Sequence, residues 1–133
     1  LDESLCFAVY SAGLAFNRVY KPILDAMGIT YPQYLVMMAL WERDGQGVGE
    51  LGEQLFLESN TLTPILKKLQ SLGYLKRQRS AADERQVIVS LTDAGAQLFA
   101  ARVETARQIT ASTLAPLSAE EARRLMDLLL RLT

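Results

Sequence analysis

The sequence has 133 residues, of which 50% are hydrophobic and 22% charged, and its formal net charge is −1. This composition is typical of a globular protein and argues against intrinsic disorder. It contains no histidine and one cysteine, Cys6, which excludes histidine-based triads, internal disulfides and cysteine-rich zinc sites. No glycine-rich phosphate loop, dense carboxylate cluster or bilayer-length apolar run is present, so we expect a soluble cytoplasmic protein that is not an enzyme and uses no cofactor, metal or membrane.

The first predicted element is a long helix over about residues 3–26. Apolar residues recur at mostly helical spacings, and Gly28 follows as a stop signal. Pro22 lies inside this helix, so we expect a kink or an irregular turn near Tyr20. The apolar surface is broader than one small domain usually needs, which favours a partner helix from a second chain. The start of the chain lacks the basic region of a secretory signal. Because the initiator Met is absent, we expect that a short N-terminal extension is missing.

Two shorter helices follow, over residues 30–43 and 48–56. Thr30 and Gln33 have the spacing of a capping box at the start of the first helix. The glycine-containing segment 44–47 separates the two. In the second helix, the residues expected to face inward are Leu51, Leu55 and Phe56.

A fourth helix is predicted from about Ser59 to Leu72, with Gly73 as its terminating residue. Its apolar stripe has the i, i+3, i+4, i+7 spacing and consists of Leu62, Ile65, Leu66 and Leu69. The opposite face is polar and basic, and Pro64 is expected to distort the first turn mildly. Two short helices joined by a tight link, the second with such an outer face, are typical of a helix-turn-helix.

The hydrophobic period then changes from helical to alternating. Residues 74–79 and 86–91 are predicted as two strands around the polar tip 80–85, and a hairpin directly after a helix-turn-helix is a wing. A helix follows from residue 92 to about 113, and a last, leucine-rich helix, capped by Ser118 and Glu121, is predicted over residues 119–132.

The predicted fold class is mainly α (α+β), a winged helix-turn-helix within a single domain. Residues 31–95 form the DNA-binding unit. The N- and C-terminal helices, in residues 1–30 and 96–133, are expected to form a helical dimerisation bundle. A homodimer is therefore expected.

Basic residues are concentrated in residues 60–91. This segment holds six basic and two acidic residues, a local charge of +4 in a chain of net charge −1. Such a footprint is typical of a nucleic-acid partner, and a solvated charged face is the alternative. Because the major groove of DNA admits one helix, we expect base edges to be read from the start of helix 59–72, by Ser59, Asn60, Thr61 and Thr63.

Other basic residues fit the DNA backbone and the minor groove. Lys67 and Lys68 are expected to meet phosphates, and Arg85 to enter a minor groove while an ion pair with Asp83 positions it. Two further arginines either contact the DNA backbone or anchor acidic neighbours; they are Arg77 and Arg79. The alternative is an ordinary amphipathic surface helix, since Ser, Thr and Asn are also capping residues. The order of helix, turn, helix, basic hairpin and long helix favours a double-stranded, pseudo-palindromic DNA operator.

Cys6 lies in the first predicted helix, where the ordinary role of a lone cysteine is that of a small buried hydrophobe. Tyr10 lies one turn away, and Tyr20 and Tyr31 follow 14 and 25 residues after Cys6. In a continuous helix, Cys6 and Tyr20 are about 21 Å apart along the axis. Tyr20 therefore cannot touch the Cys6 of its own chain, but in a dimer whose first helices cross antiparallel it could reach the Cys6 of the partner chain. There, phenol hydroxyls would donate hydrogen bonds to a thiolate, the form that peroxides oxidise.

Over essentially its whole length the chain resembles the MarR family of regulators, and more narrowly the organic hydroperoxide-sensing repressors called OhrR. The general resemblance rests on residues 69–75 (LQSLGYL), 83–85 (DER) and 91–95 (LTDAG). The narrower resemblance rests on residues 5–8 (LCFA) with Tyr10, 19–24 (VYKPIL) and 28–37 (GITYPQYLVM). It implies that Cys6 is the peroxidatic cysteine, that Tyr20 and Tyr31 bind it across the dimer, and that a gene for a thiol-dependent peroxidase is repressed.

The sequence departs from many members of this family in one respect. They carry a second, resolving cysteine, whereas no residue from 7 to 133 is Cys here. The resemblance therefore implies either a one-cysteine type, capped by a low-molecular-weight thiol, or a variant from which the resolving cysteine was removed.

Two other functions stay open. One is a MarR-like repressor released by a small aromatic ligand, with Cys6 structural. The other is a thiol peroxidase whose basic segment is incidental.

Overall fold

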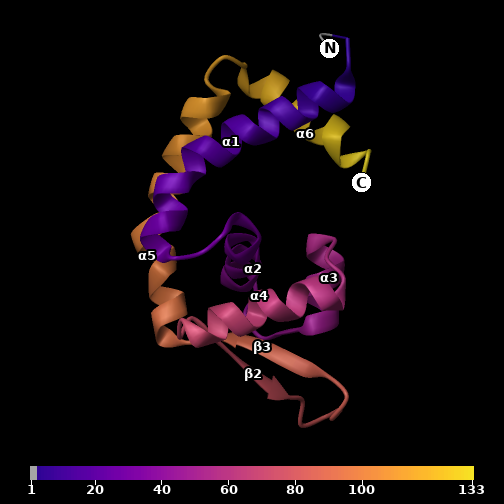
Figure 1. The fold of residues 1–133 in the computed structure, drawn as a ribbon, viewed down its shortest axis with the longest axis vertical. Helices are drawn as coiled ribbons and strands as arrows, with labels where there is room; N and C mark the ends of the chain where they lie inside the picture. The colour runs from indigo at the N-terminus through magenta and orange to yellow at the C-terminus, as the bar shows by residue number, and fades with distance from the viewer. Residues whose placement is uncertain (1–2) are drawn as a thin grey trace. The chain divides into compact units, whose positions relative to one another are not determined.

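The structure is a computed structural model that describes residues 3–133, apart from the side chain of Val103 (Figure 1). In chain order its elements are α1 (Leu5–Met27), α2 (Tyr31–Glu42), β1 (Gln46–Gly47), α3 (Val48–Leu55), α4 (Ser59–Ser71), β2 (Leu75–Arg79), β3 (Val87–Leu91), α5 (Asp93–Leu114) and α6 (Ala119–Leu130). The predicted helices and hairpin are confirmed, each end lying within two residues of its predicted position. The two-residue strand β1 was not predicted.

The chain divides into two compact units. The central unit is Ile23–Val103, and the terminal unit combines the residues up to Pro22 with Glu104–Thr133. The boundaries therefore fall inside α1 and inside α5.

A three-stranded antiparallel sheet of order β1-β3-β2 lies within the central unit. β2 pairs with β3 from Leu75↔Leu91 to Arg79↔Val87, and β1 pairs with β3 through Gln46↔Val89. The core is built from the end of α1, from α2, α3 and α4, and from the sheet. Its apolar members are Ile23, Leu24, Met27, Ile29, Tyr34, Val36, Met37, Ala39, Leu40, Leu51, Leu62, Leu66, Leu69, Leu75 and Val89.

Local signals in the sequence set where several helices begin and end. At the start of α2, the Thr30 amide donates to Gln33 Oε1 at 2.9 Å and the Gln33 amide to Thr30 Oγ1 at 3.4 Å, which completes the expected capping box. The helix α4 continues through Pro64 without interruption and is followed by Gly73, whose φ of 80° favours glycine. α1 likewise continues through Pro22 to Met27.

Phe56 corrects one expectation about α3. The sequence placed its side chain inward with Leu51 and Leu55, but Phe56 is 73% exposed. It is the C-cap of α3 and has a left-handed backbone, with φ of 56°. This conformation ends the helical periodicity before Phe56, so its side chain leaves the buried stripe.

The terminal unit contains the start of α1, most of α5, and α6. Ser118 and Glu121 form the expected capping box at the start of α6, and Tyr20 Oη lies 2.7 Å from Thr110 Oγ1. Among its described residues, Ala106 is the single buried apolar side chain, while many large apolar side chains on α1 and α6 are exposed.

No single helix among residues 3–133 is long and apolar enough to cross a membrane. The bent pair α1 and α2 meets that test together, by length and composition alone.

Candidate nucleic-acid interface and thiol site

The outward face of α4 carries the residues expected to read DNA bases. Leu62, Leu66 and Leu69 are buried, and this anchors one side of the helix in the core. The first-turn side chains of Ser59, Asn60 and Thr61 are exposed on the other side, and Thr63 is half-buried. The N-cap of α4 is Glu58, and its carbonyl accepts the Thr61 amide at 3.0 Å. Ser59 is therefore the first residue of the helix and not its cap, which weakens the interpretation of these polar residues as capping groups.

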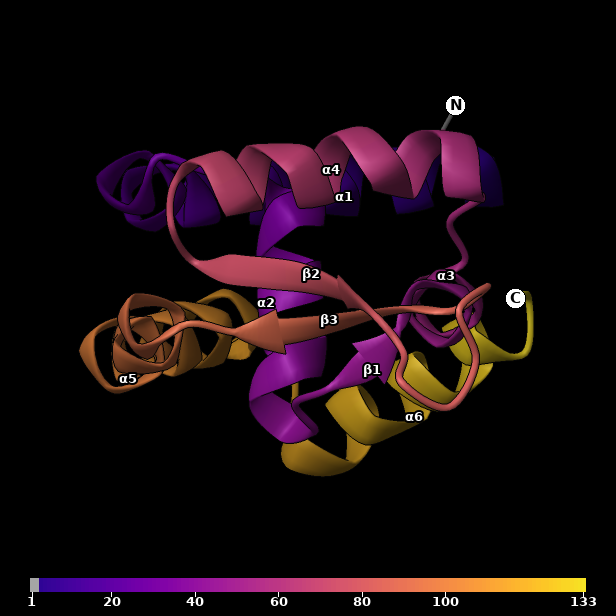
Figure 2. The same ribbon diagram turned by 90° about the horizontal axis from the view of Figure 1, so that it is seen from below.

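The second half of α4 connects to the wing. α4 packs alongside β2, as Figure 2 shows. Gln70 Oε1 accepts a 2.8 Å hydrogen bond from Arg77 Nε, so this arginine is fixed to α4 through one nitrogen of its guanidinium. Lys67 and Lys68 are exposed on the same helix. The sequence did not single out Gln70, because its role depends on the packing of β2 against α4.

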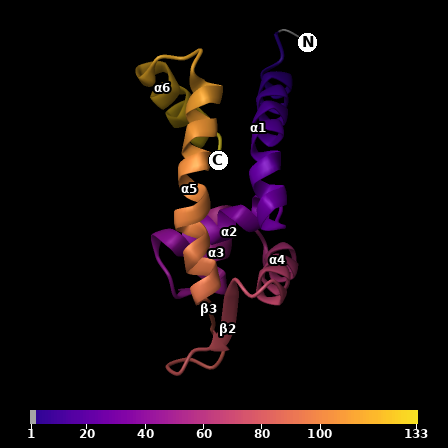
Figure 3. The same ribbon diagram turned by 90° about the vertical axis from the view of Figure 1, so that its left-hand side faces the viewer.

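The tip of the wing is held by its own side chains. Ser80 Oγ accepts the amides of Ala82 and Asp83 at 3.2 and 3.3 Å, and the Ser80 amide donates to the Gln86 carbonyl at 2.8 Å. Figures 1 and 3 show this loop at the far end of the β2–β3 hairpin. The tip is thus a hydrogen-bonded turn that the protein itself specifies.

Arg85 is positioned as the sequence suggested. Asp83 Oδ1 accepts its amide at 3.0 Å and lies 3.4 Å from its Nε, and 92% of the Arg85 side chain is exposed. An ion pair this exposed contributes at most about 1 kcal/mol to stability, so its effect is mainly to orient the guanidinium. Arg79 Nη1 donates to the Glu84 carbonyl at 2.9 Å, so this arginine braces the loop and contacts the main chain of an acidic neighbour, not its carboxylate.

A cavity of about 460 Å³ opens between α3, α4 and the wing. It brings together three of the expected site residues, Thr63 from α4 with Arg77 and Arg85 from the hairpin. Gly47, Val48 and Gly49 line it from the start of α3. The Glu50 carboxylate also lines the cavity, where it accepts the Gly47 amide at 3.4 Å and Arg43 Nη2 at 2.8 Å. The hydroxyl and guanidinium groups and the main-chain amides suit anionic oxygens.

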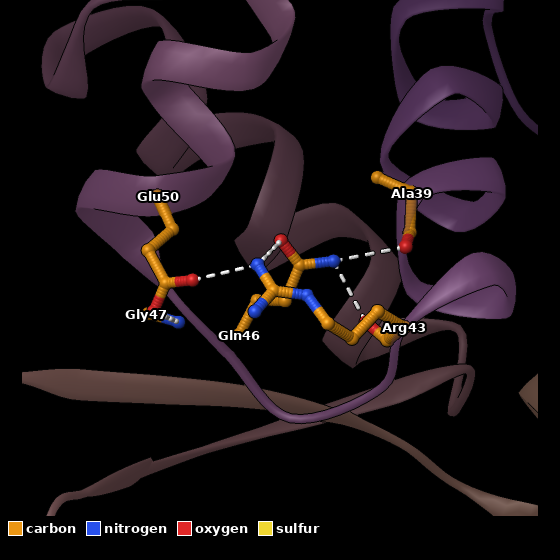
Figure 4. Close-up of polar contacts among 5 residues, drawn as sticks. All are labelled: Ala39, Arg43, Gln46, Gly47 and Glu50. Atoms are coloured by element: carbon orange, nitrogen blue, oxygen red, sulfur yellow. Dashed lines mark hydrogen bonds and ion pairs between the residues drawn. The ribbon is translucent and has the colours of Figure 1, made fainter.

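A polar cluster behind this surface fixes α3 to α2 (Figure 4). Gln46 is 1% exposed, and its Nε2 donates to the Ala39 carbonyl at 2.9 Å and to the Arg43 carbonyl at 2.7 Å, which satisfies carbonyls at the end of α2. Arg43 Nη2 in turn donates to Gln46 Oε1 at 3.3 Å and to Glu50 Oε2 at 2.8 Å. This cluster has only a weak signal in the sequence, since Gln46 lies between two glycines in a segment that resembles a turn.

The expected thiol-site residues lie in different parts of the chain. Cys6 is exposed on α1, in the terminal unit, and Tyr20 is half-buried on the same helix. Because α1 is continuous, the 14-residue separation places them about 21 Å apart along its axis. Tyr31 is the first residue of α2, in the central unit, with its ring centroid 6.2 Å from that of Tyr34. Residues 3–133 contain no group of three acidic or thiol side chains that could hold a metal ion.

Comparison with known proteins identifies the family to which this fold belongs. A family model described as transcriptional regulator SarA/Rot matches residues 18–102. The chain belongs to this family. The HTH-type transcriptional regulator TtmR of Methylorubrum extorquens is 54% identical over 95 residues, which cover 71% of this chain and 49% of TtmR. The organic hydroperoxide resistance transcriptional regulator of Bacillus subtilis is 48% identical over 98 residues, or 74% of this chain and 67% of that one. The chain thus spans about half of the first relative and two thirds of the second.

Solved structures of regulators agree with this membership. The structure of reduced AbfR of Staphylococcus epidermidis bound to DNA superposes with a TM-score of 0.77 at 38% identity, and the match covers 96% of this chain and 86% of AbfR. The regulator PcaV of Streptomyces coelicolor, in complex with its natural ligand, gives 0.91 at 25% identity, over 99% and 93%. The chain therefore has the winged-helix fold of MarR-type transcriptional regulators, which confirms the resemblance and the fold class.

Proposed function

We propose that the chain is a homodimeric repressor that binds a pseudo-palindromic DNA operator and releases it when an organic hydroperoxide oxidises Cys6. The observation that carries the DNA part is the exposed polar first turn of α4, in the same unit as a hydrogen-bonded wing tip that exposes Arg85. AbfR, which shares the fold, has been solved on DNA.

In this proposal the two elements divide the work on DNA. The first turn of α4 enters the major groove, where Ser59, Asn60 and Thr61 reach base edges. Thr63 lies deeper, at the cavity. Arg85 projects from the wing into the minor groove, pre-oriented by Asp83.

The remaining basic residues serve affinity more than sequence selection. Lys67 and Lys68 meet phosphates as exposed charges. Arg77 contacts the DNA backbone through the guanidinium nitrogens other than Nε, since Nε donates to Gln70. Arg79 acts chiefly through the shape of the wing, because it is bonded to the Glu84 carbonyl.

The exposed apolar surface of the terminal unit supports the homodimer. The exposed large apolar residues of this unit on α1 are Leu5, Phe7, Val9, Tyr10 and Leu14, and those on and after α6 are Leu125, Met126, Leu128, Leu129, Leu130 and Leu132. Monomeric proteins seldom leave so many large apolar side chains on two helices in water. A second copy of the chain would cover them and thereby place two wings on one duplex.

The proposed sensing chemistry needs one thiol and one oxidant. The Cys6 thiolate attacks the terminal oxygen of a hydroperoxide, the O–O bond breaks, and the alkoxide leaves and takes up a proton to become an alcohol. The sulfenic acid then condenses with a low-molecular-weight thiol, giving a mixed disulfide and one water. Support comes from the exposure of Cys6 and from the 48% identity to the hydroperoxide resistance regulator of Bacillus subtilis.

Tyr20 and Tyr31 are proposed to contact the Cys6 of the partner chain. The axial distance of about 21 Å along α1 keeps Tyr20 away from Cys6 of its own chain. Thr110 Oγ1, at 2.7 Å, holds the Tyr20 phenol oxygen in place.

Tyr20→Phe and Tyr31→Phe should therefore slow Cys6 oxidation and leave operator affinity nearly unchanged. A loss of DNA binding in both variants would reassign the two tyrosines to structural roles.

Fluorescence anisotropy with labelled operator DNA tests the central claim. The wild type and Cys6→Ser are each titrated with the labelled DNA before and after treatment with cumene hydroperoxide in the presence of cysteine as the small thiol. Intact-protein mass spectrometry then reports how Cys6 is modified. We expect the oxidised wild type to release DNA while Cys6→Ser stays bound. Release by both proteins would refute the cysteine mechanism. DNA binding that resists oxidant but yields to a small aromatic acid would favour the ligand-released repressor, and sustained turnover of hydroperoxide without selective DNA binding would favour the peroxidase.

A further inference from the structure

Tyr74 joins three elements of the central unit at one point. Its amide donates to the Leu69 carbonyl of α4 at 3.0 Å, and its carbonyl accepts the Thr92 amide, just before α5, at 3.1 Å. Its hydroxyl donates to the carbonyl of Met27, the last residue of α1, at 3.0 Å. One residue is therefore bonded to the end of α1, to the end of α4 and to the residue that precedes α5.

The start of α5 rests closely on the same residue. A Cβ added to Gly95 would lie 2.9 Å from the Tyr74 carbonyl carbon and nearer still to its oxygen, so the observed approach requires glycine. The Thr92 hydroxyl donates to the Gly73 carbonyl, and Trp41 Nε1 donates to the Gly95 carbonyl at 2.9 Å. The backbone of α5 is thus tied both to the end of α4 and to α2.

The course of the chain gives this junction its importance. α1 and α5 are the helices within which the boundaries between the terminal and central units fall, at Pro22/Ile23 and at Val103/Glu104. Every covalent route from the terminal unit to α4 therefore runs along α1 or α5. Within the central unit, Tyr74 is hydrogen-bonded to Met27, the last residue of α1, and to Thr92, the residue before α5. Tyr74 itself comes directly after Gly73, which follows the end of α4.

We propose that Tyr74 is the positioning residue that couples the terminal unit to DNA reading by α4. The inference rests on the proposed function for the DNA and the thiol, and adds the route between them. A displacement at the end of α1 or at the start of α5 changes the bonds at Tyr74, and the Tyr74 amide is bonded into the last turn of α4. A coupling of this kind is reciprocal, so DNA bound to α4 must also stabilise the ends of α1 and α5.

Tyr74→Phe isolates one part of the junction. It keeps the ring and both main-chain bonds and removes the hydroxyl that binds Met27. A hydrogen bond of ordinary net strength corresponds to roughly a two- to tenfold change in an equilibrium ratio. Ser71→Ala is the matched control, since the Ser71 hydroxyl donates to the Lys68 carbonyl at 2.7 Å inside α4 and bridges no second element.

Two measurements test the proposal, with a duplex selected from a random pool by the wild-type protein. Hydrogen exchange of residues 23–29 and 92–100 is compared with and without the duplex. The dissociation constant is measured before and after oxidation by cumene hydroperoxide. We expect DNA to slow exchange in both segments in the wild type and Ser71→Ala, and less so in Tyr74→Phe. We also expect the ratio of oxidised to reduced dissociation constants to fall two- to tenfold in Tyr74→Phe alone.

The outcomes separate the two proposals. Full DNA-induced protection in Tyr74→Phe overturns the role of Tyr74, and so does equal weakening of both oxidation states, which indicates a merely structural bond. If the oxidised wild type keeps its DNA affinity, the redox function fails, while the exchange comparison, which uses no oxidant, still decides on Tyr74. If the wild type selects no duplex, both proposals fall together.

Discussion

Gly95→Ala should destabilise the chain, although alanine favours helices over glycine. An added Cβ would lie within 3.0 Å of both the carbonyl carbon and the carbonyl oxygen of Tyr74, closer than real Cβ atoms come. Both partners are main chain, so no flexible side-chain end can yield. The start of α5 must move away from Tyr74.

The magnitude follows from the bonds that such a movement breaks. The Thr92 amide and hydroxyl bind the carbonyls of Tyr74 and Gly73, and Trp41 Nε1 of α2 binds the Gly95 carbonyl, so all three bonds hold the start of α5 in its present place. At about 1 kcal/mol each, their loss costs about 3 kcal/mol. The helix propensity of alanine returns about 1 kcal/mol. The net decrease in the free energy of unfolding is therefore about 2 kcal/mol.

Urea denaturation at one fixed protein concentration measures this decrease, because the stability of the proposed homodimer would depend on concentration. Gly49→Ala is the control, since Gly49 is in a helix of the same unit and a Cβ there meets no atom within 4 Å. It should be neutral or stabilising by up to about 1 kcal/mol. A Gly95→Ala protein as stable as the wild type would refute the close-approach argument, as would an equal loss in Gly49→Ala.

Three further predictions concern other parts of the chain. Gln46→Glu turns a buried donor into a carboxylate facing two main-chain carbonyls, so urea denaturation should show a loss of about 2–4 kcal/mol, whereas Gln46→Met should lose less. Arg85→Ala should weaken DNA binding and reduce the slope of log affinity against log salt by about one, while Asp83→Asn keeps that slope, as titrations at several salt concentrations would show. Hydrogen bonds from the Ser118 amide and, to a smaller extent, from its hydroxyl lower the pKa of Glu121. The cap therefore stabilises α6 fully at pH values above the ordinary carboxylate pKa, and this stabilisation is lost as the pH falls through the lowered pKa. NMR titration should find that Ser118→Ala moves the Glu121 pKa upward, and an unchanged titration would contradict the capping role.

Most helices were predictable because their signals are local. The capping boxes of Thr30 with Gln33 and of Ser118 with Glu121, and the glycine that ends α4, act within a few residues of each helix end. The Asp83–Arg85 pair was equally accessible, since both residues belong to one loop. Such features need no knowledge of how distant segments pack.

Features that depend on distant segments were missed. Strand β1 has two residues and exists because Gln46 lies opposite Val89, 43 positions later in the chain. The Gln70–Arg77 bond and the junction at Tyr74 likewise join elements that local patterns describe one at a time. The prediction that Phe56 faces inward was wrong because residue spacing does not reveal its left-handed backbone.

If the wing binds DNA as proposed, its hydrogen-bonded tip has a consequence for the kinetics of binding. Ser80 and Asp83 already hold the loop in one conformation in the free chain, so no folding of the loop has to precede the encounter. The entropic cost of ordering the loop is therefore met when the chain folds and not when it binds DNA. Association with different duplexes should therefore proceed at similar rates, and the regulator should distinguish its operator by how slowly it leaves.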